Sequence, residues 1–130
     1  MMSRIGHGTP FYCTGVGKVL LAWQDEEKIQ KYLRAERLEE FTGNTILDPM
    51  ELALELQKVR LSGCAYDNEE HEIGVRCVAA PVFDQQGKVI AALSVSGPTV
   101  RLTNNRIEML RKMVQESAFE ISAKMGYSRT

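Results

Sequence analysis

Residues 67–96, DNEEHEIGVRCVAAPVFDQQGKVIAALSVS, decide the fold. Residues 67–72 are polar, with four carboxylates and one histidine, and residues 73–83 are mainly apolar. Residues 84–87 are typical of a turn, and a second apolar run follows over residues 88–96. Two such runs around a short turn predict an antiparallel β-hairpin. The acidic loop before it would bring polar groups to the edge of a buried strand, which suggests a pocket for a small polar molecule.

The residues before the hairpin predict three helices and one more strand. Apolar residues at helical spacing favour helices over residues 18–23 and 25–33, and a polar loop is expected over 36–48. A third helix is predicted over residues 49–62, because Asp48 can cap it, Pro49 suits its first position and Gly63 suits its end. After Gly63 the apolar residues no longer recur at helical spacing, and residues 65–68 are expected to form a strand.

A long helix is predicted at the C-terminal end of the chain. Thr103 is expected to cap it and Gly126 to end it. Its buried stripe is predicted at Ile107, Leu110, Val114, Ala118, Ile121 and Met125. Helices at both ends of the chain, with antiparallel strands near the middle, indicate an α+β fold.

The composition is that of an ordinary globular protein, with 130 residues, 44% hydrophobic and 25% charged residues. This length predicts a single domain over residues 1–130. The net charge of −1 argues against nucleic-acid binding by these residues alone. No apolar run approaches the roughly 20 residues of a membrane span, and residues 1–8 do not look like a signal peptide. Three cysteines without CxxC spacing fit reduced thiols, so a cytoplasmic protein is expected.

Two serines at the end of the last predicted strand are candidates for ligand binding. Side chains alternate along a strand, so Ser94 and Ser96 point to the same face. Both hydroxyls could donate to a carboxylate or a hydroxyl of a ligand. Serines at such positions also often face solvent or bond the backbone, and the pattern by itself favours that interpretation.

Other local motifs do not predict catalysis, a metal or a cofactor. Gly15–Lys18 resembles a phosphate loop only superficially, because Val19 stands where such a loop needs Ser or Thr. A helix start there would still favour an anion, although a structural start is the simpler interpretation. His71 and its glutamates match no metal motif, and nothing in the sequence activates Cys77 as a nucleophile. Asp67, at a strand end, could simply cap a turn.

Several segments in order resemble the effector-binding domain of the isocitrate lyase regulator (IclR) family of bacterial transcription factors. The similarity runs from about Arg4 to Tyr127. It rests on residues 14–18 with 20–22, 44–46, 67–77, 79–84, 94–98 and 101–103. The segments 3–6, 10–12 and 125–127 look most like relatives that control sugar-acid or keto-sugar catabolism.

The resemblance implies a GAF-like domain whose curved antiparallel sheet cups a small organic acid. Gly15 and Val16 would donate backbone N–H groups to the ligand carboxylate, together with the hydroxyls of Ser94 and Ser96. Asp67 would accept from a ligand hydroxyl or gem-diol. Cys77 would line the floor of the pocket. Val16 departs from the alanine common in relatives, which could narrow the pocket.

Relatives also carry an N-terminal winged helix-turn-helix, which these residues do not contain. DNA binding is therefore expected only through a longer parent protein, and self-association into homodimers or tetramers is expected as in relatives. Two other classes stay open. One is a GAF-like enzyme that uses the thiol of Cys64 or Cys77, and the other is a purely structural oligomerisation domain.

Overall fold

The three strands form one antiparallel sheet in the order β1–β2–β3. They are β1 (Ala65–Asn68), β2 (Val75–Phe83) and β3 (Val89–Pro98), in a computed structural model that describes residues 10–128. The Asp84 carboxylate closes the β2–β3 turn by accepting from the backbone N–H groups of Gln86 and Lys88, at 2.8 and 3.0 Å. The predicted hairpin is therefore confirmed. Segment 3–6 of the family resemblance lies outside the described residues.

Strand β3 is longer than the sequence suggested. The predicted apolar run ends at Ser96, but strand pairing continues until Pro98 lies opposite Val75. A proline cannot donate to a ladder, so it is tolerated mainly at strand ends and on edge strands. Among the described residues β3 is an edge strand, and Pro98 is its last residue.

Four α-helices accompany the sheet in the described part of the chain. They are α1 (Gly15–Ala22), α2 (Glu26–Ala35), α3 (Pro49–Ser62) and α4 (Asn104–Lys124), with a short 3₁₀ turn, η1 (Phe11–Cys13), before α1. Helix α1 starts earlier than predicted, because the Thr14 hydroxyl accepts from the backbone N–H of Gly17 at 3.0 Å. Asp48 caps α3 and Gly63 ends it with φ of 77°, as expected.

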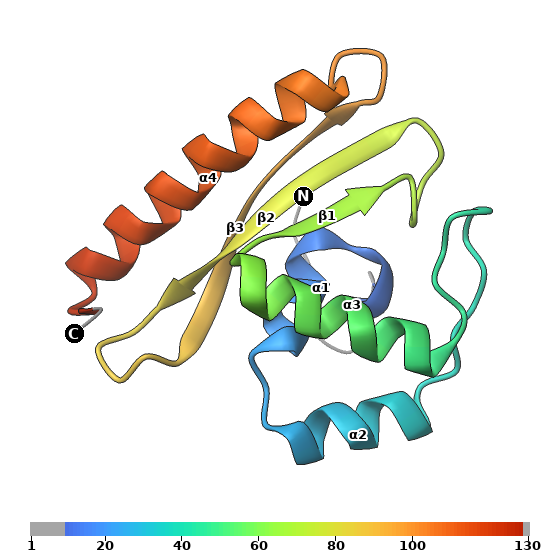
Figure 1. The fold of residues 1–130 in the computed structure, drawn as a ribbon, viewed down its shortest axis with the longest axis horizontal. Helices are drawn as coiled ribbons and strands as arrows, with labels where there is room; N and C mark the ends of the chain where they lie inside the picture. Colours follow the sequence, from blue (N-terminus) through green and yellow to red (C-terminus); the bar gives the residue numbers. More distant parts are fainter. Residues whose placement is uncertain (1–9, 129–130) are drawn as a thin grey trace.

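The sheet separates α4 from the other helices (Figure 1). Alternate residues of β2 face opposite ways. Val78, Ala80 and Val82 pack against α4, whereas Ala79 joins the core around α1 and α3. The predicted α+β fold, with its antiparallel sheet and long C-terminal helix, is confirmed.

The buried stripe of α4 differs from the prediction at its C-terminal end. The buried residues are Ile107, Val114, Ala118 and Ser122, whereas Ile121 and Met125 are 41% and 49% exposed. The predicted stripe repeats every 3.6 residues on average, which is the period of a straight helix, so the helical period alone does not explain the difference. The buried row passes through residue 122 and not through residue 121. Ser122 fits there by accepting from the Phe83 N–H at 2.9 Å and donating to the Ala118 carbonyl at 2.8 Å.

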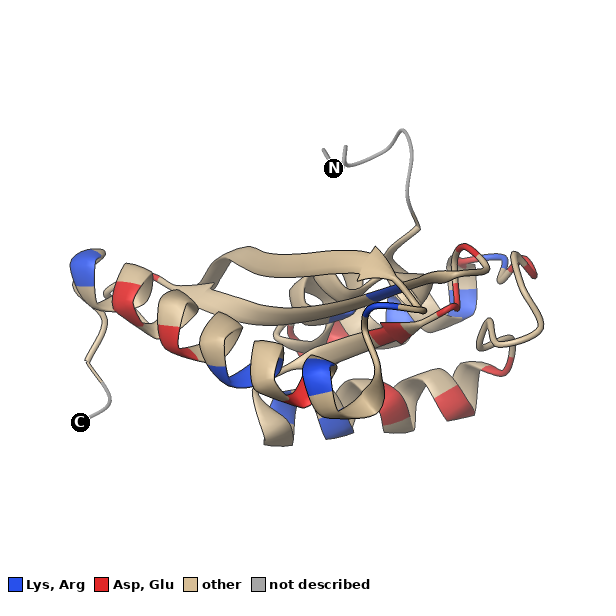
Figure 2. Ribbon diagram, turned by 90° about the horizontal axis from the view of Figure 1, so that it is seen from above, with Lys and Arg blue, Asp and Glu red and all other residues tan. Residues whose placement is uncertain are grey.

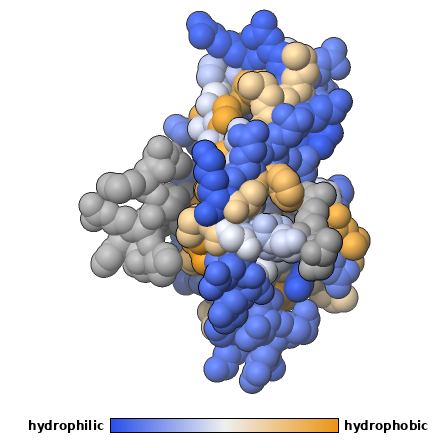
Figure 3. Space-filling model, turned by 90° about the vertical axis from the view of Figure 1, so that its left-hand side faces the viewer, coloured by the Kyte–Doolittle hydropathy of each residue, from blue (hydrophilic) through white to orange (hydrophobic). Residues whose placement is uncertain are grey.

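Charged residues are distributed unevenly over these elements. Figure 2 shows acidic and basic residues interspersed along α4, while the β2–β3 hairpin is almost free of charge. On the face shown in Figure 3, apolar residues gather towards the middle, between two hydrophilic ends. On the strands the charged residues are Asp67 and Arg76, and α4 exposes apolar side chains such as Met109 and Met113 between its charged residues.

Candidate functional site

The strand register brings three of the predicted site residues into one row. Asp67 on β1 lies opposite Cys77 on β2, and Cys77 lies opposite Ser96 on β3. The next row on the same face contains Ala65, Ala79 and Ser94. Directly opposed residues point to the same side of a sheet. The sheet therefore collects Asp67, Cys77, Ser94 and Ser96 on the face that α1 covers.

The start of α1 lies directly on this row. A Cβ atom on Gly15 would lie 3.0 Å from the Cys77 sulfur and 3.2 Å from the Ala79 Cβ, so only glycine fits without a shift of its neighbours. The first N–H groups of a helix have no partner within the helix, and their combined dipole favours an anion. Gly15 and Val16 are the first two residues of α1. Gly15 is buried, and Val16 is half-buried against the core around α1.

The members of this cluster differ in their access to solvent. Asp67 and Cys77 are buried, at 6% and 8% exposed, and form the inner part of the cluster. Ser94 and Ser96 are exposed on the edge strand. The arrangement has a buried thiol and carboxyl on one side and two accessible hydroxyls on the other. Such a set can offer hydrogen bonds to a small polar molecule from two directions.

The Cys77 thiol is not prepared for nucleophilic chemistry. Burial, followed by the nearby Asp67 carboxylate, raises the pKa of Cys77 to about 11, although hydrogen bonds with the Ser94 hydroxyl and the Gly15 backbone oppose the rise. Burial also raises the pKa of Cys13 to about 12. Reactive cysteines have a lowered pKa and an accessible sulfur. Both thiols are buried and remain protonated at neutral pH.

The Asp67 carboxyl is held by the loop that follows it. One of its oxygens, Oδ1, accepts from the Glu70 N–H at 2.8 Å. Burial raises the pKa of Asp67, and the hydrogen bond from Glu70 and the positive charge of Lys18 act in the opposite direction. Asp67 therefore caps the turn that follows β1, which is one of the roles that the sequence suggested for it. It also lies opposite Cys77 on β2.

Lys18 belongs to the same neighbourhood, and the sequence analysis gave it no role. Its side chain is fully buried, with Nζ 2.6 Å from Glu70 Oε1 and 2.9 Å from Glu55 Oε2. Burial alone would lower the pKa of Lys18, but the Glu70 and Glu55 carboxylates together raise it. One signal was present in the sequence, a lysine directly followed by the apolar run 19–22.

His71, weighed above as part of a metal cluster, makes a ring contact instead. Its ring centroid lies 5.0 Å from that of Phe41, on the loop that precedes α3. Across the part of the chain that the structure describes, no group of three or more His, Cys, Asp and Glu residues could hold a metal ion. His71 thus helps to attach the 67–74 loop to the 36–48 loop.

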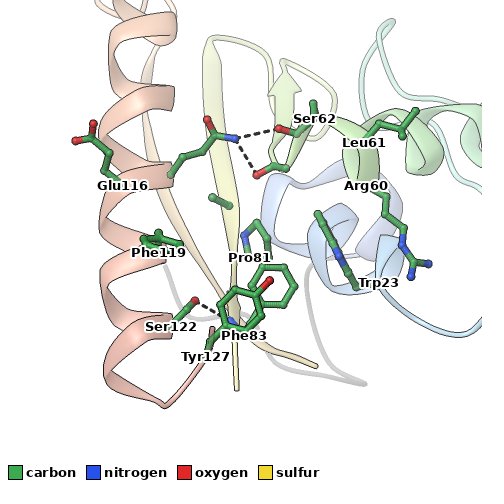
Figure 4. A pocket seen from close by; sticks show the side chains of 13 residues that line it. Trp23, Arg60, Leu61, Ser62, Pro81, Phe83, Glu116, Phe119, Ser122 and Tyr127 are labelled. Atoms are coloured by element: carbon green, nitrogen blue, oxygen red, sulfur yellow. Dashed lines mark hydrogen bonds between the residues drawn. The ribbon is translucent and has the colours of Figure 1, made fainter. Parts of the chain in front are cut away.

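Two concave regions among the described residues lie away from this cluster. The larger, about 580 Å³, lies between α3 and α4 and includes Trp23, Phe83 and Tyr127 (Figure 4). Phe83 stacks on Tyr127 with ring centroids 4.8 Å apart. The smaller, about 310 Å³, is lined mainly by α3, β1 and α4. Neither region includes any of the six predicted site residues.

Comparison with known proteins places the chain in a family. The family described as bacterial transcriptional regulator IclR C-terminal matches residues 1–123, so the chain belongs to it. The chain is 45% identical over 127 residues to the HTH-type transcriptional regulator KdgR of Escherichia coli K12. That match covers 98% of this chain and 48% of KdgR. The chain spans about half the length of the curated relatives it matches.

Solved structures agree with this assignment. The C-terminal domain of E. coli KdgR matches with a TM-score of 0.84 and 44% identity, over 92% of this chain and 73% of that one. The inducer-binding domain of a PobR double mutant from Acinetobacter, in complex with 3-hydroxybenzoic acid, matches with a TM-score of 0.83 and 33% identity. This second match covers 88% of this chain and 66% of that one.

Membership of this family distinguishes a domain of a transcriptional regulator from the GAF-like enzyme that the sequence left open. Its members are transcriptional regulators and not enzymes, which confirms the prediction that this chain is not an enzyme. None of the helices within residues 10–128 has the length and apolar character needed to cross a membrane.

Proposed function

We propose that this domain is the sensor of a bacterial transcriptional regulator and binds a small organic acid on the α1 face of the sheet. One observation carries the proposal: the first turn of α1 packs onto the strand row that contains Asp67, Cys77 and Ser96. N–H groups at a helix start and serine hydroxyls suit a carboxylate, because hydrogen bonds to an ionised acceptor are the strong ones.

The same groups favour an acid that also carries a hydroxyl or keto group. The Gly15 and Val16 N–H groups would receive the carboxylate, and Asp67 would accept from a ligand hydroxyl or gem-diol. The PobR complex supports this class, since 3-hydroxybenzoic acid has one carboxylate and one hydroxyl. The resemblance to relatives of sugar-acid and keto-sugar catabolism favours a sugar acid or keto acid for this chain.

The regulatory output would follow from linkage. A ligand that prefers one quaternary arrangement shifts the population towards it and changes DNA affinity in the parent protein. Typical coupling of about 1–3 kcal/mol would change operator affinity roughly 5- to 150-fold. DNA would be bound by a separate N-terminal domain of the parent, a cytoplasmic protein.

Self-association into dimers or tetramers is part of the proposal. Met109 and Met113 are 66% and 60% exposed and, four residues apart on α4, are neighbours on the same side of the helix. Exposed apolar residues in patches often mark interfaces between protein chains. Sedimentation of the purified domain over a range of concentrations would measure this directly.

A thermal-shift screen tests ligand binding. The purified domain would be heated with glyoxylate, pyruvate, gluconate or 3-hydroxybenzoate, each at millimolar concentration. An acid present at about 100 times its dissociation constant adds about 2.7 kcal/mol, which raises the melting temperature by several degrees in a domain of this size. Stable oligomers without a shift for any acid would favour a purely structural oligomerisation domain.

The serine pair supplies a sharper test. Ser94→Ala removes a hydroxyl that would bond an ionised carboxylate, an interaction of about 1.5–3 kcal/mol, so the affinity measured by calorimetry should fall roughly 10- to 100-fold. Ser117→Ala is the matched control, because Ser117 is an exposed serine on α4. Equal affinities in the two variants would contradict the assignment of the site to this face.

A further inference from the structure

The ammonium group of Lys18 is surrounded by three oxygen atoms inside the protein. A protonated lysine carries three N–H donors. Its Nζ lies 2.6 Å from Glu70 Oε1, 2.9 Å from Glu55 Oε2 and 2.9 Å from the backbone oxygen of Tyr66. Nζ donates hydrogen bonds to Glu55 Oε2 and to the Tyr66 carbonyl, whereas its contact with Glu70 Oε1 is an ion pair without hydrogen-bond geometry. The side chain of Lys18 is fully buried.

Glu70 connects Lys18 to the backbone around Asp67. Its second carboxylate oxygen, Oε2, accepts from the N–H of Asn68 at 3.1 Å. Its own backbone N–H donates to Asp67 Oδ1 at 2.8 Å. The Asp67 carboxyl is thus held by residue 70, and residue 70 is held by Lys18.

Two threonines hold the same loop from its other side. The Thr42 hydroxyl donates to the Glu69 carbonyl, and the Thr45 hydroxyl donates to the Glu70 carbonyl. Thr42 and Thr45 are themselves buried. Residues 69 and 70 are therefore attached to the 36–48 loop through their carbonyls and to α1 through the Glu70 side chain.

The position of Lys18 on α1 makes these contacts relevant to the ligand site. Lys18 follows Gly15 by three residues, about one helical turn, on the same helix. One rigid element thus carries both the N–H groups at its start and the ammonium group that holds the Asp67 loop. A change in the Lys18 contacts would move Asp67 relative to the N–H groups of Gly15 and Val16.

We propose that Lys18 is a positioning residue of the organic-acid site, and that it acts through Glu70 to hold Asp67 at a fixed place beside the start of α1. The proposal rests on the proposed function for the identity of the site. It assigns to Lys18 no contact with the ligand.

Glu70→Gln and Glu55→Gln form a matched pair of tests. Each removes one negative charge next to Lys18, but only Glu70 lies in the 67–74 loop and accepts from Asn68. Glutamine has one accepting oxygen where Glu70 uses two, so one of the two Glu70 contacts is lost. Native-state hydrogen exchange should therefore show the amides of Asn68 and residue 70 exchanging about tenfold faster in Glu70→Gln, with those of Val78 and Ala80 unchanged.

Calorimetry with pyruvate and gluconate completes the comparison. Glu70→Gln should weaken the binding of whichever acid the wild type binds by about fivefold or more, and Glu55→Gln by less than about twofold. Equal effects of the two variants on exchange and affinity would overturn the proposal. If the wild type binds none of the four acids of the thermal-shift screen, the proposed function fails, whereas the exchange comparison still decides whether Lys18 and Glu70 position the loop.

A double variant separates positioning from stability. Lys18→Met alone should destabilise the domain, because it leaves the buried Glu70 carboxylate without its positive partner. Lys18→Met with Glu70→Gln removes the buried charge on both sides and should recover much of the melting temperature, yet the fast exchange at Asn68 and the weak acid binding should persist. Recovery of all three properties together would assign Lys18 a merely structural role and overturn the proposal.

Discussion

The two faces of the sheet are made from alternate residues of the same strands, but they have different chemistry. On the α4 face, Val78, Ala80 and Val82 of β2 are at most 5% exposed and meet an apolar row on the helix. On the α1 face, Cys77 and Ala79 lie next to Asp67 and under the start of α1.

The difference shows how one hairpin can serve both stability and recognition. Burial of apolar area stabilises the α4 face, at about 25 cal/mol for each Å² removed from water. The α1 face instead keeps a carboxyl, a thiol and an ion pair away from water, which opposes folding unless every polar group is satisfied. The α4 face should therefore respond to substitution mainly in stability, and the α1 face in ligand binding as well.

The largest expected effect is a loss of stability when a buried side chain on the α4 face is truncated. Ile107→Ala should lower the free energy of unfolding by about 2–4 kcal/mol, because it leaves a cavity where a side chain is 2% exposed. Ile121→Ala on the same helix, at 41% exposed, should cost less than about 1 kcal/mol. Urea denaturation measures both. Similar losses at the two positions would mean that the contact row of α4 lies elsewhere.

An intermediate effect is expected where α1 meets the sheet. Gly15→Ala places a methyl group 3.0 Å from the Cys77 sulfur, so stability should fall by about 1–3 kcal/mol. The binding of organic acids should weaken as well, since the first N–H groups of α1 would be displaced from the strand row. Gly43→Ala is the control, because no atom lies within 4 Å of its added Cβ. Acid binding unchanged in Gly15→Ala, measured by calorimetry, would separate α1 from the ligand site.

The smallest effect on stability concerns Asp67 and depends on pH. Burial raises the pKa of Asp67 in the folded protein. The folded state therefore holds this proton more tightly than the unfolded state, whose aspartates titrate near about 3.9. The contribution of Asp67 to stability is then greatest below that pH and falls as pH rises through the folded-state pKa.

Asp67→Asn should remove this part of the pH dependence. At pH 7 the variant should melt above the wild type, while its binding of hydroxy acids or keto acids should weaken because the acceptor loses its charge. Melting curves between pH 4 and pH 8, with calorimetry at pH 7, measure both effects. A variant that melts below the wild type at pH 7 would show that the ionised carboxylate stabilises the fold.

Most of the secondary structure and the apolar pattern could be predicted from local signals. The hairpin followed from two apolar runs around residues 84–87, and the α3 boundaries followed from Asp48 and Gly63. The shared face of Ser94 and Ser96 followed from the alternation of strand residues. The roles of Gly15, Val16, Asp67, Cys77 and the two serines remain predictions, and the structure adds that Gly15, Asp67, Cys77 and Ser94 lie in one neighbourhood.

Two helices differ from the prediction, one through a local cap and one through a long-range contact. Helix α1 begins at Gly15 because the Thr14 hydroxyl caps Gly17, whereas the apolar pattern starts only after Lys18. Ser122, and not Ile121, lies in the buried row of α4, where its hydroxyl accepts from the backbone N–H of Phe83, 39 residues away along the chain. The periodicity of a short segment does not contain this information.

The sequence by itself determined the α+β fold, the hairpin, the long C-terminal helix and the family, because period, capping residues and ordered motifs are properties of neighbouring residues. Only the tertiary structure decided that Lys18 is buried between Glu55 and Glu70, from a helix and a loop that lie 37 and 52 positions away along the chain. A buried charge is strongly destabilising unless an opposite charge lies next to it in the fold. Which residues become neighbours in the fold does not follow from their separation along the chain.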